Sequence, residues 1–141
     1  MKQMNIFIIV PLTVFMFVGL NLTSYAAQPY VLNVQQVKAG LDKVSNPMQK
    51  GFILIDVRTA EEHQDGFIPG TDFNINYREL PQRYRDLEAR PDDHIVVYCQ
   101  TGHRSNIAAN TLMELGYKHV YNVEGSMNAW QEAGYAVERP R

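Results

Sequence analysis

The sequence has a single cysteine, Cys99, so a disulfide within the chain is excluded. It also lacks an excess of one charge, because 13 basic residues stand against 15 acidic ones. A near-neutral chain argues against general nucleic-acid binding, which uses a basic surface. Repeats, low-complexity segments and recognisable linkers are missing as well. These absences predict one compact domain that is held together without disulfides.

Long apolar runs are scarce, and the clearest one covers residues 6–20. It follows the positive Lys2 and precedes Ser24-Tyr25-Ala26, which fits the small-x-small rule for cleavage. This order predicts a secretory signal peptide over residues 1–26, and an uncleaved N-terminal anchor is the alternative. The remaining chain, 27–141, would be exported without a stable membrane anchor and with a net charge of −3. In a Gram-negative bacterium its location would be the periplasm.

Short apolar runs predict strands, and apolar residues at helical spacing predict helices. The predicted strands cover 52–57, 71–75, 94–98 and 119–123, and the predicted helices cover 34–43, 59–64, 77–90, 105–115 and 126–133. Thr59 and Glu62 have the spacing of a capping box. The alternation predicts an α/β fold with a parallel sheet and helices on both faces. A domain of about 115 residues, the size left after cleavage, permits a monomer.

Cys99 directly follows the predicted strand 94–98, at the sheet edge where parallel sheets form ligand sites. Gly102 permits the positive φ of a tight loop, whose N–H groups would surround the thiol. Arg104 adds a guanidinium fork suited to a tetrahedral oxyanion. Each feature favours the nucleophilic thiolate. The alternative is a buried, inert cysteine, but the convergence of loop, arginine and helix favours a reactive one.

Four stretches of the sequence resemble the single-domain rhodaneses, which are thiosulfate sulfurtransferases. The stretches are LIDVRTAEEHQDGFIPG at 54–70, CQTGHRS at 99–105, LGYKHVYNV at 115–123 and EGSMNAW at 124–130. They occur in the order expected for that family and cover most of the chain after residue 26. The sequence departs from the family pattern at Phe67, where histidine is common, and at Ser126, where the pattern has glycine.

The resemblance implies a rhodanese-like fold and transfer of sulfane sulfur through a persulfide on Cys99. Thiosulfate or another small sulfur donor would supply the sulfur, and cyanide in an assay, or a thiol, would accept it. No cofactor is expected. The substrate-binding residues would be Gln100, Thr101, Gly102, His103, Arg104 and Ser105, with Arg104 holding the oxyanion of the donor. Whether His103 contacts substrate or faces solvent stays open.

Charged residues outside the loop receive simpler interpretations. Asp56 and Arg58 end a predicted strand beside the site and are expected to brace the loop by hydrogen bonds or a salt bridge. Glu61, Glu62 and His63 are expected to form a solvated helix face. No metal site is expected, because Cys99 and His103 alone do not make a closed zinc site.

Two alternative functions follow from the same loop. The rival enzyme class is phosphatase or arsenate reductase activity. Phosphatases of the cell-cycle type share the expected fold. In those phosphatases five residues lie between the cysteine and the arginine of the loop, whereas four lie between Cys99 and Arg104 here. The shorter loop suits a sulfur-sized site. The other alternative is a non-enzymatic rhodanese-like module that carries persulfide sulfur or binds a partner.

Overall fold

The computed structural model describes residues 27–43 and 50–140. The predicted signal peptide at 1–26 lies outside the described residues. Within the described ranges, no helix has the length and apolar character to cross a bilayer.

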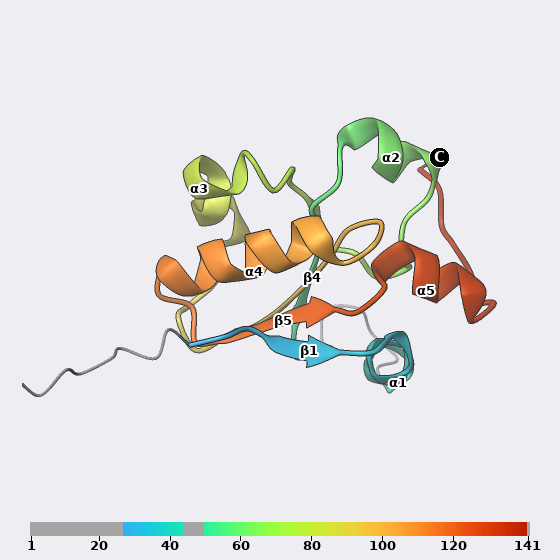
Figure 1. Ribbon diagram of the computed structural model, residues 1–141, viewed down its shortest axis with the longest axis horizontal. Helices are drawn as coiled ribbons and strands as arrows, with labels where there is room; N and C mark the ends of the chain where they lie inside the picture. Colours follow the sequence, from blue (N-terminus) through green and yellow to red (C-terminus); the bar gives the residue numbers. More distant parts are fainter. Residues whose placement is uncertain (1–26, 44–49, 141) are drawn as a thin grey trace, which may run out of the picture.

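The centre of the fold is a five-stranded parallel sheet with the order β1-β5-β4-β2-β3 (Figure 1). Its strands are β1 Tyr30–Leu32, β2 Ile53–Asp56, β3 Phe73–Asn74, β4 His94–Tyr98 and β5 His119–Val123. The predicted α/β class is confirmed, and β4 and β5 have the bounds expected from their apolar runs. Strand β1 was not predicted, because a run of three apolar residues is too short to show a strand period.

Helices cover both faces of the sheet. They are α1 Val34–Asp42, α2 Ala60–Asp65, α3 Leu80–Arg83, the 3-10 helix η2 Tyr84–Leu87, α4 His103–Glu114 and α5 Ser126–Glu132. One buried cluster joins the sheet to α3, η2 and α4, and a second joins its other face to α1 and α5. The central strand β4 contributes to both clusters, so the position of its C-terminal end is fixed from both sides.

The predicted long helix over 77–90 is wrong. The chain instead forms the short helix α3, with Pro81 in its first turn, and then η2. Pro81 has no N–H to donate to the carbonyl of Tyr77, so an α-helix cannot run through it from residue 77. Glu88 then takes a left-handed conformation with φ 49°, which ends η2. Leu80 and Leu87 still reach the core, as their spacing suggested.

Candidate active site

The loop that carries the cysteine connects the central strand to helix α4. Cys99 follows β4 directly, and α4 begins at His103. Gly102 has φ +102°, and a Cβ at this position would lie 3.4 Å from the backbone nitrogen of Gly125. Glycine is therefore favoured here by the positive φ, whereas the space near Gly125 would just admit a Cβ.

Hydrogen-bond donors surround the sulfur of Cys99. The Gly102 N–H donates to Sγ at 3.1 Å, and the Ser105 hydroxyl donates to Sγ at 3.3 Å. Burial raises the pKa of the Cys99 thiol. Hydrogen bonds from Ser105, Gly102 and Thr101 together lower it by more than burial raises it, so the pKa lies below its ordinary value. The loop therefore favours the thiolate, which is the nucleophilic form of cysteine.

The start of helix α5 fastens this loop from the other side. The Cys99 N–H donates to Ser126 Oγ at 3.1 Å, and the Ser126 hydroxyl donates to the Val123 carbonyl at 2.8 Å. The Met127 N–H donates to the Cys99 carbonyl at 3.1 Å. Ser126 is buried with φ 47°, a conformation in which glycine is more common. Ser126 was not predicted to have a role, although a serine at a glycine position of the motif was a signal in the sequence.

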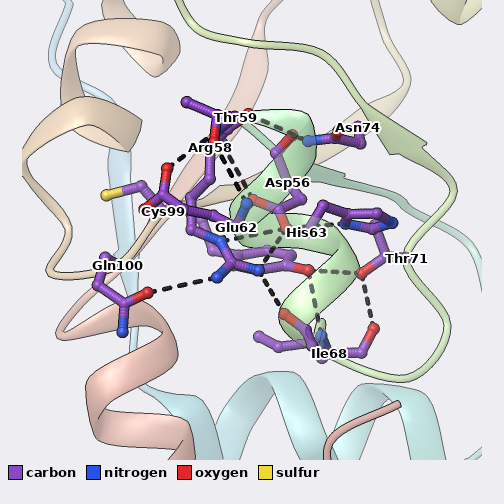
Figure 2. A network of polar contacts seen from close by, with 12 residues as sticks. Asp56, Arg58, Thr59, Glu62, His63, Ile68, Thr71, Asn74, Cys99 and Gln100 are labelled. Atoms are coloured by element: carbon purple, nitrogen blue, oxygen red, sulfur yellow. Dashed lines mark hydrogen bonds and ion pairs between the residues drawn. The ribbon is translucent and has the colours of Figure 1, made fainter. Parts of the chain in front are cut away.

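Asp56 and Arg58 form a buried ion pair next to the loop, as Figure 2 shows. Asp56 accepts bonds from the backbone N–H, Nε and Nη2 of Arg58. Arg58 in turn donates to Gln100 Oε1 at 3.3 Å and to the Gly66 carbonyl at 2.6 Å. Burial lowers the pKa of Arg58, but Asp56 outweighs this effect and raises it. The pair thus lies where a brace for the loop was expected.

His63 departs from the expected solvated face. Its Nδ1 lies 2.9 Å from Asp56 Oδ2 (Figure 2). Its ring stacks on Phe67 with centroids 4.3 Å apart. The prediction for His63 was wrong because the pattern of α2 showed neither the buried Asp56 nor the aromatic partner at 67. His63 thus places an imidazole beside Asp56. Residue 67, where histidine is common in the family, is a phenylalanine in this chain.

Glu62 also leaves the predicted solvated face, and it binds the arginine of the loop. Arg104 Nη1 and Nη2 donate to the two Glu62 carboxylate oxygens at 2.8 and 2.7 Å. Glu62 completes the predicted capping box with Thr59, which fixes its position on α2. Hydrogen bonds from Arg104 are the main reason that the pKa of Glu62 falls to about 2, against a smaller rise from burial. The Arg104 fork, expected to hold a donor oxyanion, thus faces a carboxylate.

The other loop side chains lie at the rim. Thr101 and His103 are exposed, and Gln100 Nε2 donates to Asn128 Oδ1 at 2.6 Å. Asn122, on β5, donates from Nδ2 to the Gly102 carbonyl at 3.2 Å and is a further support that the sequence did not reveal. Within residues 27–43 and 50–140, no three His, Cys, Asp or Glu side chains group as metal ligands would. The loop can therefore hold an anionic sulfur species mainly through N–H and hydroxyl donors.

Comparison with known proteins adds independent information on this arrangement. A family model described as a rhodanese-like domain matches residues 37–133. The chain is 34% identical over 94 residues to a putative mitochondrial thiosulfate sulfurtransferase of Schizosaccharomyces pombe, across 59% of this chain and 66% of that protein, which is just under two thirds. It is 34% identical over 112 residues to the thiosulfate sulfurtransferase GlpE of Pseudoalteromonas translucida, across 77% of this chain and 95% of that one. A rhodanese-related protein from Thermoplasma volcanium has the same fold, with TM-score 0.65 and 28% identity over 79% of this chain and 99% of that chain.

Proposed function

The chain belongs to the rhodanese-like domain family, and from this premise we propose that it is a sulfurtransferase that carries sulfane sulfur on Cys99. One observation carries the proposal: the Cys99 sulfur accepts hydrogen bonds from Gly102 and Ser105 within a loop that follows the central strand. These donors stabilise negative charge on sulfur, both in the thiolate and in a persulfide. The names of relatives in S. pombe and P. translucida support thiosulfate as the donor to test.

The proposed reaction is a double displacement. The Cys99 thiolate attacks the outer sulfur of thiosulfate, the sulfur–sulfur bond breaks with its electron pair, and sulfite leaves. A persulfide remains on Cys99. Cyanide, or a thiol in its place, then attacks the terminal sulfur, so that thiocyanate or a new persulfide forms and the Cys99 thiolate returns. The two steps balance without any oxidant or reductant.

The chain supplies three kinds of assistance in this scheme. The loop N–H groups and the Ser105 hydroxyl hold the charge on the attacking sulfur. Ser126 fixes the backbone of Cys99 through its hydroxyl. The pair of Asp56 and Arg58 holds Gln100, the next residue of the loop. None of these roles requires a cofactor or a metal ion.

We also propose that residues 1–26 direct export and are removed near Ala27, which would place a monomeric protein in the periplasm of a Gram-negative cell. The support is the order of a positive residue, an apolar run and small residues in the sequence. Expression of the full chain, fractionation of the cells and N-terminal sequencing of the product test this. An intact N-terminus in the membrane fraction would contradict it.

The test of the enzymatic proposal is production of thiocyanate from thiosulfate and cyanide by residues 27–141, with Cys99→Ser as the matched variant. We expect turnover by the native sequence and none by the variant, while circular dichroism shows both folded. If the native protein makes no thiocyanate but intact mass shows sulfur added to Cys99, the protein is a persulfide carrier. If neither product appears in reduced protein, the sulfurtransferase proposal is wrong.

A further inference from the structure

Both arginines near the Cys99 loop are neutralised by carboxylates. Arg58 pairs with the buried Asp56 at 2.6 Å. Arg104 pairs with Glu62 through both terminal nitrogens, at 2.7 and 2.8 Å. The guanidinium charges that would attract an anion are therefore matched by two negative charges at nearly the same places. A doubly charged anion gains little net attraction from such pairs.

The pair of Arg104 and Glu62 is within electrostatic reach of the reacting sulfur. The hydrogen bonds that Arg104 donates to Glu62 are the largest cause that raises the pKa of Arg104. Burial lowers this pKa, and the charge of Cys99 adds a smaller increase. Arg104 also lies at the start of α4, directly after the loop that carries Cys99, so charge on the sulfur acts on Arg104. Arg104 and Glu62 are each about 30% exposed, at 27% and 32%, so the pair lies at the accessible rim.

From this charge balance we infer that Glu62 determines donor specificity. By neutralising Arg104, it favours singly charged alkyl persulfides over the thiosulfate dianion as sulfur donors. The inference rests on the proposed sulfurtransferase function and names the donor class of the same site. Arg104 without Glu62 would offer a free fork to an oxyanion. Arg104 bound to Glu62 leaves the donor to the N–H and hydroxyl groups around Cys99, which hold a sulfur anion without demanding a sulfonate end.

The chemistry of an alkyl persulfide balances in the same way as that of thiosulfate. The singly charged donor R–S–S⁻ first takes a proton from solvent, because its outer sulfur is electrophilic only as R–S–SH. The Cys99 thiolate then attacks that outer sulfur, the bond between the two sulfurs breaks, and the thiolate R–S⁻ leaves with the electron pair. The proton of the donor ends on the new Cys99 persulfide or passes to solvent. The leaving group R–S⁻ carries one negative charge on sulfur. Thiosulfate instead releases sulfite, which leaves as a dianion. The advantage of low charge therefore applies to both the donor and the leaving group.

The variant Glu62→Gln tests the inference with little structural cost. Glutamine also serves in a capping box, so the bond to the Thr59 N–H and the start of α2 can be kept. The substitution removes the negative charge that faces Arg104. It also replaces one of the two acceptor oxygens by an amide N–H₂, so that one terminal nitrogen of Arg104 loses its partner. Glu61→Gln is the matched control, because it removes the same charge from the neighbouring, exposed position of the same helix.

The measurement is the single-turnover rate of sulfur addition to Cys99, followed by quenching and intact mass, over a range of donor concentrations. The donors are thiosulfate and freshly prepared cysteine persulfide. This half-reaction avoids cyanide, which consumes persulfides directly. We expect Glu62→Gln to lower the half-saturating thiosulfate concentration by roughly three- to ten-fold, as expected for one partly screened charge near the donor. The value for cysteine persulfide should change much less, and Glu61→Gln should alter neither.

Any of three results in this assay would overturn the inference while leaving the sulfurtransferase proposal intact. The native protein could reach half-saturation at a lower concentration of thiosulfate than of cysteine persulfide. The thiosulfate dependence could be unchanged in folded Glu62→Gln, or it could change equally in Glu61→Gln.

Salt dependence gives a readout that needs no variant. A neutralised site predicts a thiosulfate dependence that is nearly constant with ionic strength, and a steep rise with salt would contradict it. If neither donor adds sulfur to the native protein, the sulfurtransferase proposal itself fails and the inference fails with it.

Discussion

We expect Asp56→Asn to destabilise the domain strongly, because it leaves the guanidinium of Arg58 without a counter-charge. Asp56 is fully buried and accepts bonds from both the backbone and the side chain of Arg58, and from His63. An asparagine of the same shape would present an amide N–H₂ to a group that only donates. The result is a buried charge facing another donor, which is among the costliest arrangements in a folded protein.

The size of the effect follows from the burial of the pair. Removal of one partner of a buried ion pair costs roughly 3–5 kcal/mol. A domain of this size has a free energy of unfolding of about 5–15 kcal/mol, so the variant should retain a fraction of it. The melting temperature should fall by roughly 10–25 °C, since each kcal/mol shifts it by several degrees in a domain of this length.

Urea unfolding is the assay, followed by circular dichroism and by fluorescence of Trp130. Trp130 is the only tryptophan and is buried against α1 and the sheet, so its emission reports loss of the core. The double variant Asp56→Leu with Arg58→Met removes both charges together. We expect it to recover much of the lost stability, because an apolar pair replaces a buried ion pair at little cost or with a gain.

The double variant also separates stability from positioning. It lacks the bond from Arg58 to Gln100, so sulfur transfer should stay impaired even where stability recovers. An Asp56→Asn protein within about 1 kcal/mol of the native one would refute the reasoning, since a buried unpaired charge cannot be that cheap. A double variant as unstable as the single one would show that shape, and not charge, dominates at this site.

Three further outcomes follow from the hydrogen bonds and pKa values. The Glu62 carboxylate has its pKa lowered from 4.5 to about 2, so its stabilisation is complete above pH 4.5 and lost as the pH falls toward 2. Because the pair is one-third exposed, the loss should be about 1–2 kcal/mol, and the urea midpoints of the native protein and of Glu62→Gln should converge in acid; midpoints that stay apart would contradict this. Ser105→Ala removes a donor to the Cys99 thiolate, so the midpoint of iodoacetamide alkylation should move to higher pH, and an unchanged midpoint would count against the bond. Ser126→Ala leaves the buried N–H of Cys99 without its acceptor, so it should lower stability by about 1–3 kcal/mol and slow sulfur transfer, whereas native-like values for both would show that the bond is dispensable.

The elements that position the cysteine could be predicted because their signals are local. The apolar runs at 94–98 and 119–123 gave β4 and β5 with their observed bounds. A cysteine, a glycine and a helix start immediately after a buried strand placed the loop at the correct sheet edge. The capping box of Thr59 and Glu62 was readable too, since it spans three residues.

The contacts that bind the site together could not be predicted in the same way. Glu62 and Arg104 are 42 residues apart, and His63 meets Asp56 only because α2 folds back over the end of β2. A periodic pattern tells which helix face is polar, but it does not tell which polar face meets another. The helix expected over 77–90 does not form for a local reason, because Pro81 has no N–H to donate to the carbonyl of Tyr77.

The pairing of the first strand with the last has a consequence for the order in which the chain folds. Residues 30–32 pair with residues 121–123, and the cysteine loop is tied to Ser126, Met127 and Asn128. During synthesis on a ribosome, strand β1 cannot pair until nearly all of the rest of the chain has been made. Such long-range parallel pairing slows folding. The segment that bonds to the backbone of Cys99 and Gln100 is therefore made last, and we expect the loop to take the conformation that lowers the pKa of the thiol only after that segment has folded onto it.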